Sequence, residues 1–368
     1  MLWLPLLLLA GYAVLIRFYY RAWKAVPAWV APEREPVTRV SVVVAARNEA
    51  QNIPALVACL SRQRYPAHLF EVILVDDHSE DATAVLFRQE APAGFRLVLL
   101  EEGSGKKKAL ETGIAAARGE WIVTTDADCR MGADWLRTMM LFVEERHPAF
   151  VAAPVSMEGG AGGLHRFQEL DFLVLQGITA ASVHAGAHSM CNGANLAYPR
   201  AAFYEVEGFR GIDGIASGDD MLLMHKIAGR YPGRAAYLKA EPAIVTTGTE
   251  PTLRAFLRQR MRWASKTRFY SDRRIFWVLV LVFALNAALP LLLAGALWNL
   301  HYLWAALALL VLKTVIEWPF VRAVAAFYGK KKELRLFPLL QPFHMLYTVS
   351  AGALGQAGVY TWKGRKTK

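Results

Sequence analysis

The pattern of hydrophobic and polar positions changes twice along the chain. Residues 1–16 form an unbroken apolar run, a long middle region alternates short apolar runs with polar stretches, and the chain past residue 274 is again mostly apolar. The outer patterns are typical of helices in lipid, whereas the middle pattern is typical of a domain folded in water. The pattern therefore predicts one soluble domain held between membrane segments.

Basic and aromatic residues follow the first apolar run, and positive charge on that flank predicts a transmembrane anchor, residues 1–24, with its N-terminus outside the cell. A secretory signal is the alternative, but such a signal carries its basic residues before the apolar core. Residues 25–37 are rich in proline and predict a linker.

The middle region, residues 38–250, alternates β-branched runs with stretches that favour helices. Strands are predicted over residues 39–49, 70–79, 95–103 and 119–129, with a helix over residues 50–63 between the first two. Such alternation predicts an α/β domain with a mostly parallel sheet, whose ligands bind at the carboxyl ends of the strands.

The region after residue 250 predicts a membrane-bound end. Residues 251–274 have apolar positions at helical spacing with many arginines between them, which is the pattern of a basic interfacial helix. A plain juxtamembrane stretch that only sets topology is the alternative. Residues 275–298 form an uncharged run that predicts a span. A second span is predicted over residues 301–320, where Lys313 and Glu317 lie one turn apart and are expected to pair.

The last apolar segment, residues 337–360 within a membrane region of residues 275–368, is interrupted by prolines and glycines. If every segment crossed, the basic C-terminus would lie outside, against the positive-inside tendency. We therefore expect this segment to be re-entrant or interfacial rather than spanning, which is tolerated where it packs on protein.

Composition and charge support a membrane enzyme. The chain has 55% hydrophobic residues and a formal net charge of +11. Its basic residues gather where apolar segments meet polar ones. We therefore interpret the positive charge as setting the membrane topology and expect no nucleic-acid partner. Three widely spaced cysteines favour neither a disulfide framework nor structural zinc.

Two carboxylates, Asp126 and Asp128, lie at the end of the strand predicted over residues 119–129. At this spacing both can reach a hard divalent cation, and Mg²⁺ or Mn²⁺ is commonly held by one or two carboxylates together with substrate phosphates. A solvated turn is the alternative, because two aspartates at this spacing occur in many loops by chance.

Further candidate groups accompany this pair. Asp76 and Asp77 end another predicted strand, and Lys106 follows two glycines in a run that could approach phosphates. Beyond them lie the acidic pair in the run "SGDDM" and the run "QRMRW" at residues 259–263.

In order and spacing these groups resemble the family 2 glycosyltransferases of the GT-A fold. The resemblance covers roughly residues 38–270 and is greatest to the membrane-embedded branch related to cellulose, hyaluronan, chitin and poly-N-acetylglucosamine synthases and to lipid glycosyltransferases. It implies a Rossmann-like, mostly parallel sheet together with transmembrane helices. The acidic pair departs from the cellulose-type pattern, since it reads GDD rather than TED, but this change leaves Asp220 in place.

The resemblance also implies roles for individual residues. Asp220 would be the catalytic base, Asp128 would hold the metal with Asp126, and Asp219, Asn192 and Gly193 would lie on the acceptor side. The residues that would bind the nucleotide sugar are Ala45, Arg47, Glu49, Asp77, Lys106, Asp126, Gln259, Arg262 and Trp263.

The implied activity is inverting, metal-dependent transfer of a hexose from a nucleotide sugar, expected to be a UDP-sugar, with Mg²⁺ or Mn²⁺ as cofactor. The expected acceptor is a lipid or glycan at the bilayer, and a partner subunit stays open. We expect a multi-pass protein of the bacterial inner membrane with a cytoplasmic catalytic domain. A processive polysaccharide synthase and a non-catalytic membrane scaffold are the alternatives; the small number of membrane segments argues against a long translocation pore.

Overall fold

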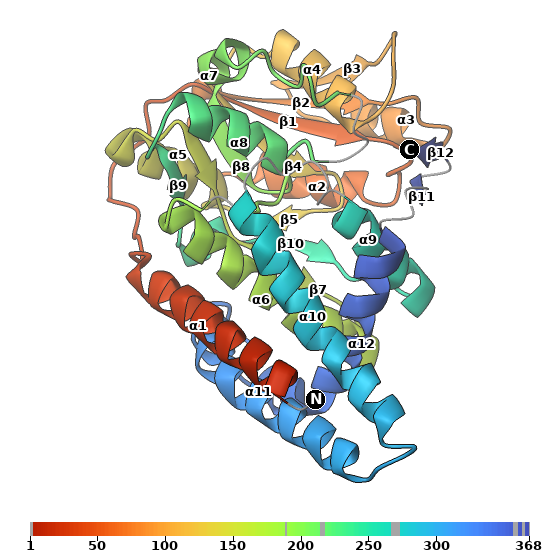
Figure 1. Ribbon diagram of the computed structural model, residues 1–368. Coiled ribbons are helices and arrows are strands. Elements are labelled where there is room, and N and C mark those ends of the chain that lie inside the picture. Colours follow the sequence, from red (N-terminus) through yellow and green to blue (C-terminus); the bar gives the residue numbers. More distant parts are fainter. Residues whose placement is uncertain are drawn as a thin grey trace.

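The computed structural model describes residues 3–187, 190–213, 218–265, 273–355, 360–362 and 365–367. Figure 1 shows a sheet domain at one end of the molecule and long helices at the other. The predicted division into a sheet domain and long apolar helices is therefore visible in the architecture.

A seven-stranded sheet forms the centre of the domain. Its strands are, in spatial order, β3 (Phe95–Leu99), β2 (Phe70–Asp76), β1 (Val40–Ala46), β4 (Trp121–Asp126), β8 (Leu196–Pro199), β6 (Phe150–Ala152) and β9 (Ala235–Tyr237). The first four strands are parallel, β8 runs antiparallel to β4 and to β6, and β9 is parallel to β6. The prediction of a mostly parallel α/β sheet is confirmed.

Helices cover both faces of this sheet. Val43 and Ile73 point into a core shared with Ile114 of α4 (Lys106–Ala116), whereas Val42 and Leu74 point into a second core with α2 (Ile53–Ser61). Because both faces are covered, the central strands are apolar at nearly every position instead of alternating. Polar groups that could bind a ligand are therefore expected only at the ends of the strands.

The other elements complete the domain. A smaller sheet contains β5 (Arg130–Met131), β10 (Val245–Gly248) and β7 (Val155–Glu158). The remaining helices are α3 (Thr83–Glu90), α5 (Trp135–Arg146), α6 (Gly163–His184), α7 (Arg200–Glu205), α8 (Met221–Arg230) and α9 (Leu253–Ala264). A short hairpin of β11 (Tyr360–Trp362) and β12 (Arg365–Thr367) lies near the C-terminus.

Helix α6 lies between the sheet domain and the long helices α1 (Trp3–Ala25) and α11 (His301–Phe327). Its approach to α11 is so close that a Cβ atom added at Gly177 would lie 2.5 Å from Val324. α6 is buried along most of its length, which fits a helix inside the protein rather than one lying on a bilayer.

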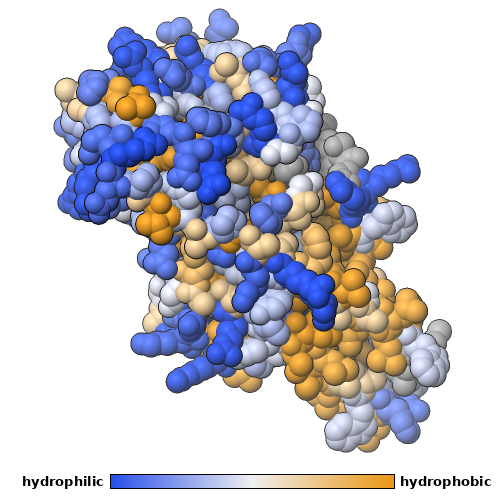
Figure 2. Space-filling view, turned by 90° about the vertical axis from the view of Figure 1, so that its left-hand side faces the viewer, coloured by the Kyte–Doolittle hydropathy of each residue, from blue (hydrophilic) through white to orange (hydrophobic). Residues whose placement is uncertain are grey.

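Three helices among the described residues are long and apolar enough to span a membrane: α1, α10 (Arg273–Gly295) and α11. Many of their large apolar side chains are exposed, and Figure 2 shows hydrophobic residues gathered on the end of the molecule formed by these helices. These features indicate association with a membrane. The expected pair on α11 is present, with Nζ of Lys313 2.6 Å from a carboxylate oxygen of Glu317.

The last apolar segment begins as α12 (Phe337–Gly355) and is not among the candidate spans of the described chain. Gln341 near its start contacts Lys313, whereas Gly355 at its end lies against Met261 of α9. The basic interfacial helix predicted over residues 251–274 begins as α9, and its part at residues 266–272 lies outside the described residues.

Candidate active site

The candidate residues gather at the carboxyl edge of the parallel strands. Ala45 of β1 is in register with Val75 of β2 on one side and with Asp126 of β4 on the other. Parallel strands that end in register deliver their following loops to the same place. The polar groups after β1, β2 and β4 therefore lie next to one another.

Lys106, at the start of α4, lies in the middle of these acidic groups. Its Nζ is 2.6 Å from Oδ1 of Asp126 and 3.2 Å from Oδ2 of Asp219. Burial alone would lower the pKa of Lys106, but Asp126, Asp219 and Asp220 raise it well above its usual value. Burial and the charge of Asp128 raise the pKa of Asp126, whereas Lys106 lowers it. One ammonium thus joins the first aspartate of the DxD pair to the acidic pair.

Asp128 turns toward the smaller sheet. Its Oδ2 accepts a hydrogen bond of 2.8 Å from the hydroxyl of Thr247 on β10. This contact brings β10, and α9 that follows it, to the edge where β4 ends. The two aspartates of the pair therefore have different neighbours, with Asp126 facing Lys106 and Asp128 facing Thr247.

Asp220 caps the N-terminus of α8. Its Oδ1 accepts from the N–H of Met221 at 2.7 Å, and its Oδ2 accepts from the N–H of Gly193 at 3.2 Å. The carbonyl of Gly193 in turn accepts from Thr124 of β4 at 3.0 Å. Asn192 uses its Oδ1 to cap the N–H of Ala194.

The residues expected to bind the nucleotide support one another across β1 and β2. Oδ2 of Asp77 accepts from the N–H of Gly105 at 2.9 Å, which fixes the loop before Lys106. Arg47 donates to the carbonyls of Asp77 and His78 at 2.8 and 2.7 Å. In this structure Arg47 therefore holds the loop after β2.

Glu49, two residues past Arg47, is held in the same way. Its N–H donates to Thr83 at 2.8 Å, and its carboxylate accepts from Asn52 at 2.7 Å. Both contacts lie between the loop after β1 and the starts of α2 and α3. Glu49 thus shapes the rim of the edge.

The QxxRW run lies on α9. Gln259 donates to Glu250 at 3.0 Å, and the ring of Trp263 lies 6.0 Å from that of Phe172 on α6. The backbone carbonyl of Arg262 accepts from Ser265. Gln259 and Trp263 thus contact the segment after β10 and helix α6, whereas none of these contacts joins them directly to Asp126 or Asp220.

The acidic residues fit a divalent cation that is shared with a substrate. No group of three or more histidine, cysteine or acidic side chains among the described residues forms a complete protein cage. Asp126 and Asp128 nevertheless lie two residues apart at the end of β4, and burial together with the like charge of Asp128 raises the pKa of Asp126. Mg²⁺ is usually held by one or two carboxylates and by phosphates rather than by a full protein cage, so the donor set matches such an ion.

Thr247 and Glu250, which contact Asp128 and Gln259, were not predicted as site residues. Both lie around the end of β10, far from Asp128 in sequence. A Thr-rich run after a short apolar stretch gave no signal on its own. Only pairing of β10 with β5, the strand after Asp128, brings Thr247 to the site.

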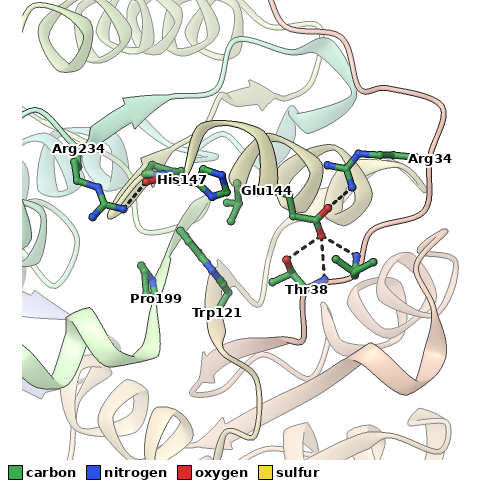
Figure 3. A pocket seen from close by; sticks show the side chains of 10 residues that line it. Arg34, Thr38, Trp121, Glu144, His147, Pro199 and Arg234 are labelled. Atoms are coloured by element: carbon green, nitrogen blue, oxygen red, sulfur yellow. Dashed lines mark hydrogen bonds and ion pairs between the residues drawn. The ribbon is translucent and has the colours of Figure 1, made fainter.

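A cavity of about 480 Å³ lies at the opposite, amino-terminal edge of the strands. Figure 3 shows Glu144 among its lining residues, bonded to Arg34 and Thr38, both of which precede β1. Trp121, the first residue of β4, also lines it. The length of β4 separates this cavity from Asp126, so it is not part of the candidate site.

Comparisons with known proteins identify what the chain is similar to. Residues 41–206 match the family model "Glycosyl transferase family 2". An N-acetylglucosaminyltransferase of Rhizobium meliloti (strain 1021) is 28% identical over 248 residues, which are 64% of this chain and 57% of that protein. One of Rhizobium sp. (strain N33) is 27% identical over 345 residues, 86% of this chain and 74% of that protein.

The fold is also shared with a solved structure. The mannosyltransferase PcManGT from Pyrobaculum calidifontis, in complex with GDP-Man and Mn²⁺, has a TM-score of 0.63 at 22% identity, covering 97% of this chain and 99% of that one. This likeness supports the expected GT-A fold. The chain therefore carries a glycosyltransferase domain of family 2.

Proposed function

We propose that the chain transfers one hexose, with inversion, from a nucleotide sugar to a lipid or glycan acceptor at the membrane, with Mg²⁺ or Mn²⁺ as cofactor. The observation that carries this proposal is the convergence of Asp126, Asp128, Lys106 and the acidic pair at one edge of the sheet. The family model and the Rhizobium relatives support the reaction class.

In the proposed reaction the acceptor hydroxyl attacks the anomeric carbon from the side opposite the diphosphate. The new bond forms between that carbon and the acceptor oxygen, the bond to the diphosphate oxygen breaks, and Asp220 takes the proton. The nucleoside diphosphate leaves with the bonding electrons. When bound, the metal ion neutralises charge on the diphosphate.

The residues divide the work. Asp77 and Glu49 form the nucleotide side with Ala45 and Arg47, and Asp126 and Asp128 hold the cation. Lys106, which lies between Asp126 and Asp219, would contact the diphosphate of the donor. Asp219, Asn192 and Gly193 lie on the acceptor side, while Gln259, Arg262 and Trp263 on α9 hold the diphosphate and acceptor.

We place the catalytic domain on the cytoplasmic face of a bacterial inner membrane. Lys24, Arg273 and Lys330 lie at the ends of α1, α10 and α11 that adjoin the domain, and Lys330 contacts Glu169 of α6. With three spans, this orientation agrees with the positive-inside tendency. α12 is then a re-entrant helix, because its start lies beside Lys313, about 20 Å along α11 from the domain end.

Which sugar the donor carries is a separate part of the proposal. The Rhizobium relatives are N-acetylglucosaminyltransferases, whereas PcManGT was solved with GDP-Man. The names of the two sequence relatives give N-acetylglucosamine as the transferred sugar, and together with the UDP-sugar expected from the sequence we propose UDP-N-acetylglucosamine as the donor. Transfer of a single unit is favoured over polymerisation, because the three candidate spans pack on one another and on α12.

The test is release of nucleoside diphosphate by the detergent-purified chain with UDP- and GDP-sugars, with and without Mg²⁺ or Mn²⁺, in a bacterial lipid extract. We expect metal-dependent release with UDP-N-acetylglucosamine and a labelled lipid product carrying one sugar. A ladder of products would favour the synthase. Metal-dependent donor binding without turnover, even with acceptor extracts, would favour the scaffold.

A further inference from the structure

Arg260 is a buried charge inside the QxxRW run. Its side chain is 4% exposed and lies 2.9 Å from the carboxylate of Asp171, which is 3% exposed, on α6. The guanidinium also lies 4.2 Å from the ring centre of Trp263 and 4.8 Å from that of Phe256. Arg260 is thus enclosed by one carboxylate and two aromatic rings.

A buried ion pair is weak evidence for a purely stabilising role. Removing two charges from water costs about as much as their attraction returns, so apolar residues of similar volume often serve stability equally well. The guanidinium group offers what an apolar side chain lacks, a flat cation that stacks on rings and donates in fixed directions. The contacts of Arg260 use both properties.

These contacts reach two residues of the proposed acceptor and diphosphate site. Nη1 of Arg260 donates to Oε1 of Gln259 at 2.9 Å, and Nε2 of Gln259 donates to Glu250 at 3.0 Å. Glu250 is tied to α6 through Gln168, which bonds to both its N–H and its carbonyl. The orientation of Gln259 and the stacking of Trp263 therefore share one anchor, Arg260.

The anchor also connects α9 to the membrane region. The hydroxyl of Tyr347 on α12 donates to Oδ1 of Asp171 at 2.5 Å, beside the ion pair. A Cβ atom added at Gly355 would lie 3.0 Å from the carbonyl oxygen of Met261. Helices α6, α9 and α12 thus meet at the Asp171–Arg260 pair, next to the bilayer in the orientation proposed above.

We infer that Arg260 is a positioning residue, which holds Gln259 and Trp263 in the orientation needed for sugar transfer and is itself fixed by Asp171. The inference rests on the proposed function for its effect on turnover. Its structural part concerns only the orientation of Trp263. The two can therefore be tested separately.

The experiment uses the full chain labelled with 5-fluorotryptophan, with the ¹⁹F signal of Trp263 assigned from the Trp263→Phe variant. In Arg260→Met we expect this signal to shift or broaden and kcat for nucleotide release to fall about ten- to a hundredfold, the size of effect of a small misplacement. The dissociation constant for UDP with Mn²⁺ should rise by a smaller factor than kcat falls, because Gln259 and Trp263 are proposed to help hold the diphosphate while Lys106 and the DxD pair are unchanged.

Arg254→Met is the matched control, because Arg254 is exposed on the same helix. It should leave the Trp263 signal and kcat unchanged. Loss of turnover in both variants would assign the effect to the charge of α9 and overturn the inference. An unchanged Trp263 signal in a folded Arg260→Met variant would overturn it as well.

Two further variants separate positioning from folding. Arg260→Gln with Asp171→Asn replaces the ion pair by neutral groups, so we expect thermal unfolding near that of the wild type but low kcat. Recovery of kcat together with stability would show that the pair only holds the fold. Arg260→Lys keeps the charge but loses the flat stacking surface, and wild-type kcat in this variant would also refute the inference.

If the wild type shows no turnover with any donor, the proposed function fails. The ¹⁹F signal and the UDP affinity still report whether Arg260 orients Trp263.

Discussion

Two regions of the molecule each contain a lysine that contacts acidic side chains, Lys106 at the sheet and Lys313 in the long helices. The two regions differ in the balance of positive and negative charge. At the edge of the sheet, Lys106 contacts Asp126 and Asp219, and Asp128 and Asp220 lie close enough to affect the pKa of one or other partner. Three of these carboxylates raise the pKa of Lys106, and the fourth, that of Asp128, raises the pKa of Asp126. Among these five groups the negative charges outnumber the positive one.

In the long-helix region, Lys313 contacts one carboxylate, that of Glu317, at 2.6 Å and the carbonyl oxygen of Gln341 at 2.9 Å. Glu317 also accepts hydrogen bonds from Tyr12 of α1 and from the amide of Gln341 on α12. The one positive and one negative charge on α11 are thus bonded by neutral donors and acceptors from two other helices, α1 and α12.

The difference shows how a buried charge can be interpreted. A balanced, fully bonded group can hold helices together without any ligand. A group with excess negative charge at an open strand end is stabilised further by a cation. We therefore assign chemistry to the sheet edge and helix assembly to the Lys313 group, and substitutions should affect them differently.

The largest expected effect is on turnover at the sheet edge. Asp220→Asn should lower kcat by about 10³-fold, because a general base supplies a factor of this order. Donor binding should stay near normal, since the change leaves Asp126 and Asp128 in place. Nucleotide release and isothermal titration with UDP measure the two quantities.

The control is Asp213→Asn, because Asp213 is an exposed acidic residue shortly before α8. This variant should retain full activity. A large loss of donor affinity in Asp220→Asn would contradict the assignment of Asp220 as base.

Substitutions in the Lys313–Glu317 group should change the stability of the protein rather than its turnover. Lys313→Met leaves Glu317 buried without its cation, so we expect a loss of about 3–5 kcal/mol in unfolding free energy. The double variant with Glu317→Gln should recover most of this loss, because both charges are then removed. Thermal unfolding in detergent measures it. Equal destabilisation of the single and double variants would contradict the interpretation of a closed ion pair.

Asp128→Asn should act on the cation alone. Since partners of metal ligands change metal affinity by about 10–100-fold, removal of a ligand charge should weaken Mn²⁺-dependent UDP binding by at least about tenfold. Metal-free nucleotide binding should change little. A titration of UDP affinity against Mn²⁺ distinguishes the two, and an unchanged Mn²⁺ requirement would remove Asp128 from the cation site.

The features that could be predicted from the sequence are those that a local pattern of residues determines. Buried parallel strands read as continuous apolar runs, so the sheet could be predicted together with the strand ends that carry the candidate site, and the one-turn spacing of Lys313 and Glu317 predicted their pair. The bond from Thr247 to Asp128 spans 119 residues, and the Asp171–Arg260 pair joins α6 to α9. Neither follows from periodicity, because both depend on how separate elements pack.

Glu144 provides a third comparison, because its charge is balanced by Arg34. It lies at the amino-terminal ends of the strands, opposite the candidate site (Figure 3). Burial alone would raise its pKa, but hydrogen bonds from Val37, Arg34 and Thr38 lower the pKa of Glu144 below its usual value. A lowered pKa means that the folded state favours the carboxylate. The resulting stability is present above the unfolded pKa of about 4.3 and is lost as the pH falls through the folded value.

Glu144→Gln should therefore cost the smallest amount, about 1 kcal/mol at pH 7, because the amide oxygen still accepts hydrogen bonds but no longer carries charge. The difference from wild type in thermal unfolding should shrink below about pH 4 as the wild-type carboxylate becomes protonated. UDP binding should be unaffected at every pH, because Glu144 and Asp126 lie at opposite ends of β4. A change in UDP affinity would show that the two edges are coupled, and a pH-independent difference in stability would show that charge is not what Glu144 contributes.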